Sequence, residues 1–313
     1  MGSDKVRNIA ILGAGVMGSS IAQVFAQHGY VVKLYDLKQE VLEHALKLIN
    51  STLKTFVDVD RLSSQEISGI VDRIHPTKDL ASAVKGADFV IEAVFEEPNV
   101  KKKLFSQLND LCPKDIVLAS NTSGLDIFNL AEIDNPERLI ITHWFSPAHI
   151  IPLVEIIPGK KTSREVVDFT QKLMENLGKK TIVLKEFVPA FIVNRIQNAI
   201  NSAVFEIIEN GWADPEDIDQ AVKNTLGIRL PVVGVAQALD FNGLDLIHTI
   251  NERLGRKSTF IAEKVEKGLL GAKTSKGIYD YGDRSEAEIL RKRDDLYLKM
   301  LAHLEKINAF EPV

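Results

Sequence analysis

The chain has 313 residues, of which 45% are hydrophobic and 26% charged, and its net charge is −5. This composition is that of a globular protein and excludes a disordered chain, and the length predicts two domains. Acidic and basic residues are interspersed, which argues against a nucleic-acid partner, and no apolar run is long enough to cross a bilayer. The single cysteine, Cys112, rules out an intrachain disulfide and a cysteine-based zinc site, and we expect no bound metal. Residues 1–5 lack the apolar core of a signal peptide, so a cytoplasmic location is expected.

Strand and helix patterns alternate through the first part of the chain. An apolar run at residues 6–12 ends in glycines, and from Val16 the apolar spacing becomes helical until Gly29. The alternation continues, with strands expected at residues 31–35, 88–94, 116–120, 139–145, 154–157 and 181–184, and helices at 41–57, 100–111 and 164–177. Strands separated by helix-length segments pair in parallel through crossovers. The sequence therefore predicts an α/β domain built on a doubly wound sheet.

The pattern changes after Leu184. Residues 191–210 carry apolar side chains at helical spacing, and residues 214–216 (Asp-Pro-Glu) start another helix with a cap, a proline and an acidic first turn. A later strand pattern, at residues 277–281, is short. We therefore expect residues 1–187 to form the doubly wound sheet and residues 188–313 to form an all-helical domain.

A glycine-rich turn joins the first predicted strand to the first predicted helix. The turn reads Gly13-Ala14-Gly15-Val16-Met17-Gly18, which fits G-x-G-x-x-G, and Asp36 follows the second strand. In such a turn Gly13 allows the tight bend, Gly15 lets the backbone approach a pyrophosphate, and Gly18 lets the helix pack on the strand. The pyrophosphate then meets the free N–H groups where the helix begins, around Val16 and Met17. A carboxylate at Asp36 accepts both ribose hydroxyls of NAD and repels the 2′-phosphate of NADP, so the sequence predicts a Rossmann-type NAD site.

Polar residues gather at the ends of two later strands. Residues 120–123 read Ser-Asn-Thr-Ser, and residues 142–147 read Thr-His-Trp-Phe-Ser-Pro. Strand ends of such a sheet face the ligand crevice, and histidine is suited to take a hydroxyl proton as a hydride leaves for nicotinamide. Glu155 lies inside an apolar run, where a carboxylate is costly without a partner. We therefore interpret His143 as a general base and Glu155 as the group that orients it.

With these motifs the sequence resembles the 3-hydroxyacyl-CoA dehydrogenase family over nearly its whole length. The similar segments are residues 13–18, 91–94 (Ile-Glu-Ala-Val), 120–123, 143–147, 153–157, 191–195 (Phe-Ile-Val-Asn-Arg) and 273–279 (Lys-Thr-Ser-Lys-Gly-Ile-Tyr). The resemblance implies NAD-dependent oxidation of a 3-hydroxyl group, with His143 as the general base and Glu155 as its partner. It also implies that the helical domain forms a homodimer.

The resemblance implies further site residues. Ser123 and Asn194 would hydrogen-bond the oxygen atoms of the substrate, with Ser123 also bordering the cofactor. Glu96, Lys101 and Lys273 would contact the NAD end of the site.

Four departures from the family bear on the substrate. Ser146 stands where acyl-CoA members usually carry an asparagine near the nicotinamide, and its hydroxyl keeps a donor there through water. The usual Gly-x-Pro-x-Gly-Pro stretch is replaced by residues 227–234, which places Arg229 where a guanidinium would clamp a carboxylate. Aspartates stand among residues 57–61, where lysines usually bind the CoA phosphates, so Lys54 and Arg61 remain as the available bases. Residues 149–152 (His-Ile-Ile-Pro) resemble the gulonate dehydrogenase and lambda-crystallin branch instead.

Three hypotheses follow from these features. The first is oxidation of a short (S)-3-hydroxyacyl-CoA, such as 3-hydroxybutyryl-CoA, to its 3-keto thioester. The second is the same chemistry on a free 3-hydroxy acid whose carboxylate is bound by Arg229. The third is a non-catalytic, NAD-binding relative of the lambda-crystallin kind, which the presence of His143, Glu155, Ser123 and Asn194 disfavours.

Overall fold

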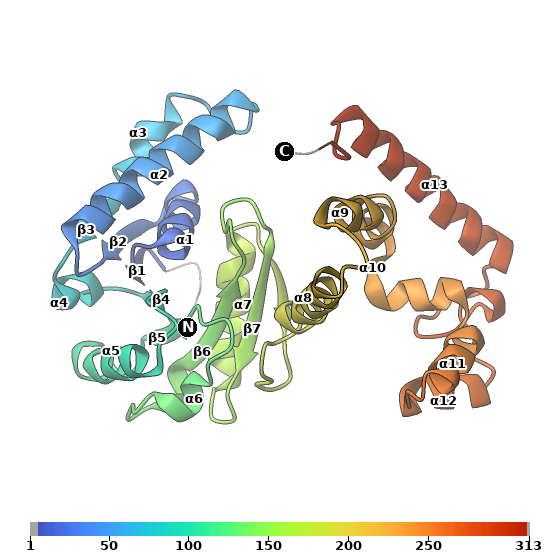
Figure 1. The fold of residues 1–313 in the computed structure, drawn as a ribbon. Coiled ribbons are helices and arrows are strands. Elements are labelled where there is room, and N and C mark those ends of the chain that lie inside the picture. The colour runs from blue at the N-terminus through green and yellow to red at the C-terminus, as the bar shows by residue number, and fades with distance from the viewer. Residues whose placement is uncertain (1–5, 312–313) are drawn as a thin grey trace. The chain divides into compact units, whose positions relative to one another are not determined.

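The computed structural model describes residues 6–311, so residues 1–5, whose sequence suggested no signal peptide, lie outside the described part. The chain forms two compact units, Met1–Ala199 and Ile200–Val313 (Figure 1). Helix α8 (Val193–Glu209) begins in the first unit and ends in the second. The division therefore falls after the predicted boundary at residues 187 and 188.

An eight-stranded sheet forms the centre of the first unit. Its strands are β1 (Asn8–Leu12), β2 (Val31–Tyr35), β3 (Ile74–Thr77), β4 (Phe89–Glu92), β5 (Val117–Ser120), β6 (Leu139–Trp144), β7 (Leu153–Pro158) and β8 (Lys180–Val183). They lie in the order β3-β2-β1-β4-β5-β6-β7-β8 (Figure 1). The carboxyl ends of β1, β4, β5 and β6 meet at one edge, which is the edge where ligands bind in such sheets. The predicted doubly wound α/β fold is confirmed.

Strand β7 departs from the expected parallel pairing. It runs antiparallel to β6, whereas every other pair in the sheet is parallel. A loop, residues 145–152, joins β6 to β7 without a crossover helix, so the chain turns back beside the strand it has just left. Parallel pairing was predicted for strands that helix-length segments separate, and β6 and β7 are not separated in this way. Their antiparallel pairing places His143 opposite Glu155.

Helices cover both faces of the sheet. They are α1 (Val16–Gln27), α2 (Gln39–Asp58), α3 (Glu66–Val71), α4 (Leu80–Val84), α5 (Pro98–Leu111), α6 (Ile127–Leu130), the short 3-10 helix η2 (Pro136–Arg138) and α7 (Arg164–Asn176). One buried cluster joins α1, α2 and α7 to the face that carries Ile140 and Trp144. A second joins α4, α5 and α6 to the opposite face, which carries Ile141. This alternation follows from the period of two along a strand.

The second unit is helical. After α8 it contains α9 (Pro215–Lys223), α10 (Leu226–Asn242), α11 (Leu244–Arg253), α12 (Thr259–Glu266), the 3-10 helix η3 (Ala272–Thr274) and α13 (Glu286–Lys306). The strand predicted at residues 277–281 is not formed; only isolated bridges at Lys276 involve this region. Buried Asp240 accepts hydrogen bonds from the backbone N–H groups of Ile278 and Tyr279, which takes up the donors that a strand would use.

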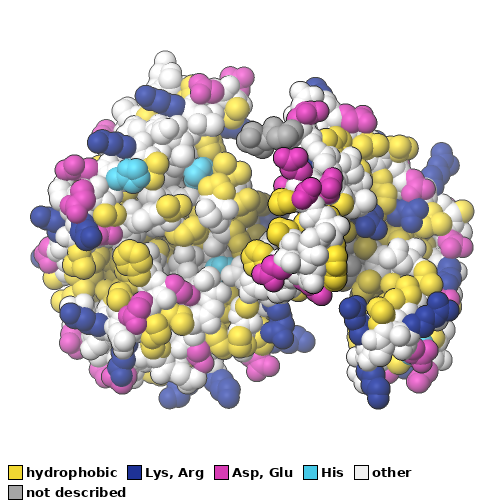
Figure 2. Space-filling model, viewed as in Figure 1, with side chains coloured by type: hydrophobic (Ala, Val, Ile, Leu, Met, Phe, Trp, Pro, Cys, Tyr) yellow, Lys and Arg dark blue, Asp and Glu magenta, His cyan; other side chains and the backbone are white. Residues whose placement is uncertain are grey.

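Charged side chains are mixed over the surface. Figure 2 shows lysine, arginine, aspartate and glutamate side chains interspersed on the visible face. Among the described residues no single helix is long and apolar enough to span a membrane, although α10 and α11, bent by 80°, meet the length and composition criteria as a pair. No group of three or more His, Cys, Asp or Glu side chains within residues 6–311 is arranged to hold a metal ion.

Candidate active site

The glycine turn lies between β1 and α1, at the carboxyl edge of the sheet. Gly13 has a φ of 101°, and a Cβ there would meet the carbonyl oxygen of Ala93 at 2.5 Å. A Cβ at Gly18 would overlap the backbone carbonyl of Gly13. A Cβ at Gly15, in contrast, would meet no heavy atom within 4 Å. The first and third glycines are therefore required by the fold, whereas the second keeps free a space beside the turn.

Helix α1 begins at this free space without a capping side chain. Its N-cap is Gly15, so no side chain satisfies the first backbone N–H groups, and Val16 is 64% exposed. Asp36 follows β2 and closes the other side of the turn, where its carboxylate accepts hydrogen bonds from the N–H groups of Ala14 (3.0 Å) and Lys38 (3.1 Å). An open cradle, free helical N–H groups and a nearby carboxylate fit the pyrophosphate and ribose of NAD.

His143 and Glu155 form a buried pair across β6 and β7. The Nδ1 atom of His143 lies 2.8 Å from Oε2 of Glu155. His143 is 4% exposed and Glu155 is 0% exposed. The other oxygen, Oε1, accepts hydrogen bonds from the backbone N–H groups of Ile192 (3.1 Å) and Val193 (3.0 Å), where α8 begins. Because the carboxylate only accepts, Nδ1 carries the ring proton, and Nε2 is left with a lone pair. Nε2 makes no hydrogen bond to a described residue.

Aromatic rings and a strained turn fix the imidazole. The ring centroid of His143 lies 4.5 Å from that of Phe145 and 5.2 Å from that of Phe191. Ala190 and Phe191 both adopt positive φ angles, 63° and 49°, which are uncommon for residues other than glycine. This turn directs the backbone N–H groups of Ile192 and Val193 at Glu155. The strained residues therefore stand next to the hydrogen bonds that join the start of α8 to the His143–Glu155 pair.

Ser123 and Asn194 lie together near a second carboxylate. Glu96 accepts hydrogen bonds from the hydroxyl of Thr122 (2.5 Å) and from the backbone N–H of Ser123 (2.9 Å). The side-chain amide of Asn194 donates to the carbonyl of Ser123 (3.2 Å). Burial raises the pKa of Glu96, but the Thr122 hydroxyl, the charge of Lys101 and the Ser123 N–H outweigh it and hold the pKa below its usual range. The structure thus brings three predicted site residues, Glu96, Ser123 and Asn194, together.

Lys101 has two carboxylate partners. Its Nζ atom lies 2.7 and 2.8 Å from the two oxygens of Glu92 and 3.3 Å from Glu96, and the residue is 1% exposed. Glu92 is fully buried and also accepts a hydrogen bond from the hydroxyl of Ser120. Sequence reasoning missed Glu92, although it stands in an apolar run as Glu155 does. The contact of Lys101 with NAD remains a prediction.

The loop of residues 145–152, called here the β6–β7 loop, is anchored at two points that the sequence did not indicate. The Nζ atom of buried Lys179 donates to the carbonyls of Ala148 (2.5 Å) and Ile151 (2.8 Å) and lies 5.4 Å from the ring centroid of Trp144. The hydroxyl of Ser20, on α1, lies 2.7 Å from Nδ1 of His149. Desolvation lowers the pKa of Lys179 to about 8. Exposed Ser146, a predicted neighbour of the cofactor, lies within this anchored loop.

Four other predicted site residues, Lys54, Arg61, Arg229 and Lys273, are not among the contacts described above. Lys54 on α2 and Arg61 after it are exposed, and neither makes an ion pair with a described residue. In the second unit, Lys273 lies 2.6 Å from Asp245, and Arg229 on α10 is half-buried without an acidic partner among residues 6–311. The roles of these four residues toward ligands remain predictions.

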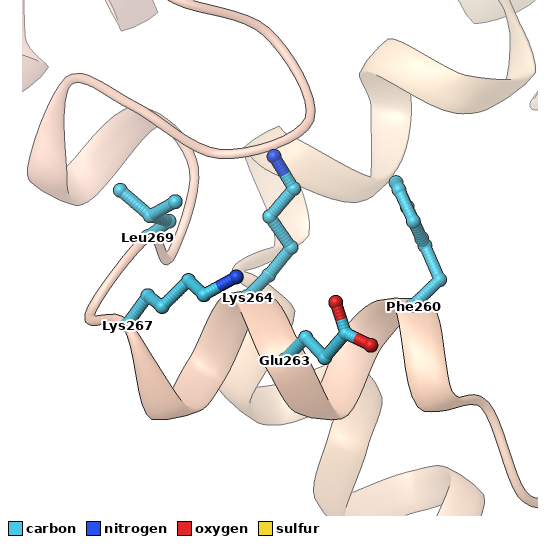
Figure 3. Close-up of a pocket in the computed structure, with 5 residues that line it drawn as sticks. All are labelled: Phe260, Glu263, Lys264, Lys267 and Leu269. Carbon is cyan, nitrogen blue, oxygen red and sulfur yellow. The ribbon is translucent and has the colours of Figure 1, made fainter.

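The second unit carries a small hollow on α12, of about 130 Å³. Phe260, Glu263, Lys264, Lys267 and Leu269 line it (Figure 3). Lys264 donates to the carbonyl of Gly277 at 2.7 Å, so its ammonium is used within the fold. None of the predicted site residues lines this hollow.

Comparison with known proteins places this geometry in a family. Residues 8–187 match the NAD-binding domain of 3-hydroxyacyl-CoA dehydrogenases, and residues 191–281 match the C-terminal domain of the same enzymes. The chain is 34% identical over 284 residues to 5-formyl-3-hydroxy-2-methylpyridine 4-carboxylate 5-dehydrogenase of Mesorhizobium japonicum, covering 88% of this chain and 91% of that one. It is 33% identical over 282 residues to 3-hydroxybutyryl-CoA dehydrogenase of Clostridioides difficile, with 87% and 99% covered.

A solved structure gives the same assignment. The 3-hydroxyacyl-CoA dehydrogenase of Archaeoglobus fulgidus superposes with a TM-score of 0.78 at 30% identity, covering 96% of this chain and 99% of that one. The predicted NAD cofactor and dehydrogenase class are confirmed by these matches. The chain belongs to the 3-hydroxyacyl-CoA dehydrogenase family of NAD-dependent oxidoreductases.

Proposed function

We propose that the protein oxidises the 3-hydroxyl of a short 3-hydroxyacyl-CoA, of the 3-hydroxybutyryl-CoA type, to the 3-keto thioester. The observation that carries this proposal is the His143–Glu155 pair, which leaves the Nε2 lone pair of a buried imidazole without a partner among the described residues. A lone pair held in this way is what the removal of a hydroxyl proton requires.

In the proposed mechanism the residues divide the work on one alcohol. Nε2 of His143 accepts the hydroxyl proton as the carbon–oxygen bond becomes a carbonyl, and Glu155 stabilises the imidazolium that forms. Bound NAD would supply the acceptor for the hydride that leaves the same carbon. The Ser123 hydroxyl and the Asn194 amide donate hydrogen bonds to the substrate oxygens. Gly15 and the first turn of α1 would hold the pyrophosphate, and Asp36 would accept hydrogen bonds from the ribose hydroxyls.

Two exposed basic residues on and after α2 are available for the CoA end of the substrate. We assign Lys54 and Arg61 to the CoA phosphates, because both are exposed and without ion-pair partners among the described residues. The relative from Mesorhizobium japonicum is named for a free pyridine carboxylate, which favours a second candidate, a free 3-hydroxy acid. Under that candidate Arg229, half-buried and without an acidic partner in the described structure, binds the carboxylate.

The formation of NADH with each substrate class tests the two candidates. We expect turnover with 3-hydroxybutyryl-CoA and little with free 3-hydroxybutyrate; the reverse result would favour the free acid.

His143→Ala should lower kcat by about 10² to 10⁴, the range for loss of a general base, while NAD affinity stays unchanged. Wild-type turnover in this variant would remove His143 from the proposal. Arg229→Ala should leave KM for the thioester unchanged, whereas a large rise in KM for a free 3-hydroxy acid that the wild-type enzyme oxidises would support the second candidate.

The homodimer implied by the family resemblance is also proposed, through residues 188–313. Phe205, Ile208 and Trp212 are 60%, 40% and 66% exposed in the described chain, and large exposed apolar side chains in one region are typical of an interface. Light scattering at micromolar concentration checks it, and a mass of one chain would contradict it.

A further inference from the structure

A pocket of about 140 Å³ borders both the cofactor helix and the β6–β7 loop. Its walls are mostly apolar, with Val16 from α1, Leu48 and Ile49 from α2, and Pro147 and His149 from the loop. Val16 is the first residue of the helix that faces the pyrophosphate, and Pro147 lies four residues after the proposed base. A substrate that reaches His143 past α1 and the loop would therefore run beside this pocket.

Most polar groups of the pocket are used within the protein. The Ser19 hydroxyl donates to the carbonyl of Val16 at 3.1 Å. The Thr52 hydroxyl donates to the side chain of Gln23 at 2.5 Å, and the Gln23 amide faces Gln27. Both hydroxyls are therefore used within the protein, and the Gln23 side chain is buried and held by Thr52 and Gln27.

His149 differs, because its partner at Ser20 decides its tautomer. The Ser20 hydroxyl oxygen accepts the backbone N–H of His149 at 3.1 Å and lies 2.7 Å from Nδ1. The hydroxyl hydrogen has no other acceptor among the described residues, so it is donated to Nδ1. The ring proton of the neutral imidazole is then on Nε2. Burial lowers the pKa of His149, as does the charge of Lys179, which favours this neutral form.

The Nε2–H group is left without a partner among the described residues. It makes no hydrogen bond to any of them, it is not one of the buried unpartnered polar atoms of the structure, and His149 is one of the residues that line the pocket. The ring itself is held, since its centroid lies 5.9 Å from that of Phe56 and its backbone is fixed to Ser20. His149 thus contributes a fixed, uncharged donor without a described partner to a pocket whose walls are mostly apolar.

We propose that this pocket is a substrate subsite that takes an uncharged aliphatic arm, with His149 Nε2–H donating to an amide or thioester carbonyl oxygen on that arm. A carboxylate or phosphate is disfavoured, because apolar walls and a single neutral donor do not compensate for the desolvation of a charge. The inference rests on the proposed oxidation of an acyl thioester. It makes His149 a specificity-determining residue that distinguishes a thioester arm from a free acid.

Kinetics with a truncated thioester test the subsite. The N-acetylcysteamine thioester of 3-hydroxybutyrate carries the thioester and one amide but none of the CoA phosphates, so Lys54 and Arg61 do not contribute to its binding. His149→Phe keeps an aromatic ring against Phe56 and removes the donor. We expect it to raise KM for this thioester about three- to tenfold, the value of one neutral hydrogen bond, with kcat nearly unchanged. His149→Gln, which returns an amide N–H, should restore most of the loss.

Two further variants separate the subsite from a purely structural role. Ser20→Ala removes the anchor of the ring but keeps the imidazole, so its KM should rise less than that of His149→Phe; an equal rise would overturn the inference. Leu48→Phe fills the pocket and should also raise KM, which gives a second reading if the histidine variants fold poorly. If the wild-type enzyme oxidises the thioester and both His149→Phe and Leu48→Phe leave KM unchanged, the subsite is wrong. If the wild-type enzyme oxidises no thioester, the proposed function itself is wrong, and the inference falls with it.

Discussion

Buried Lys179 contacts the β6–β7 loop, and its burial makes the free energy of unfolding depend on pH. Desolvation lowers its pKa from 10.5 to about 8 in the folded protein, and the residue is 8% exposed. Between these two values the unfolded chain holds a proton that the folded chain has lost. The free energy of unfolding therefore rises with pH in that window. The full difference corresponds to about 3 kcal/mol, of which about 1.3 kcal/mol falls between pH 7 and pH 9.

The substitution Lys179→Met removes the titrating group and keeps an apolar stem of similar length. The difference in unfolding free energy, wild type minus variant, should increase by about 1.3 kcal/mol from pH 7 to pH 9, because only the wild type gains stability from the lost proton. Urea unfolding followed by circular dichroism at both pH values measures this difference. Lys180→Met, at the exposed neighbouring lysine, is the matched control, and its difference should be the same at both pH values.

A flat difference for Lys179→Met would refute the reasoning, because it would mean that the ammonium is solvated and does not bear the cost of burial. A decrease with pH would also refute it, since that sign requires a lysine whose charged form is favoured by the fold.

The glycine turn and the His143–Glu155 pair give two further predictions. Gly15→Ala should leave the melting temperature nearly unchanged, because its Cβ meets no protein atom, and should weaken NAD binding about tenfold or more, because the Cβ occupies the space left for the pyrophosphate. Gly18→Ala should instead lower the free energy of unfolding by about 1–3 kcal/mol, because its Cβ collides with the Gly13 carbonyl. Thermal melts with and without NAD separate the two, and equal losses of stability would contradict the distinction. Glu155→Gln should lower kcat by about 10² to 10⁴, because the backbone N–H groups at Oε1 would keep the amide oxygen and turn the amide N–H toward His143 Nδ1, which selects the wrong tautomer. Steady-state kinetics of Glu155→Gln, together with a measurement showing normal NAD affinity, check this prediction. A fall in kcat of less than threefold would contradict it.

Local sequence patterns were sufficient for the features that depend on near neighbours. The glycine spacing at residues 13–18 predicted the turn, since tight bends and close helix packing are set by the residues that form them. The cost of an isolated carboxylate in an apolar run predicted that Glu155 has a buried partner. The same argument applied to Glu92 would have predicted that it has a buried partner, which the structure shows to be Lys101.

Other features depended on which segments meet in space. Strand β3 was not predicted from the sequence, because it contains Pro76, which disfavours a strand. It forms through its pairing with β2. The segment at residues 277–281 has a strand pattern, but buried Asp240 takes its N–H groups. Ser20 and His149 are separated by 129 residues, so no local pattern joins them.

The sequence by itself determined the doubly wound fold, the NAD site and the candidate base. These follow from hydrophobic period, glycine spacing and the chemistry of single residues, all of which are local properties. The tertiary structure decided that β7 runs antiparallel to β6, so that Glu155 lies opposite His143 and receives the N–H groups that begin α8. It also decided that Lys179 and Ser20 hold the loop between these two strands. The physical reason is that strand direction and the partners of buried polar groups depend on contacts between segments that are far apart in the sequence. Local spacing of residue types contains no information on those contacts.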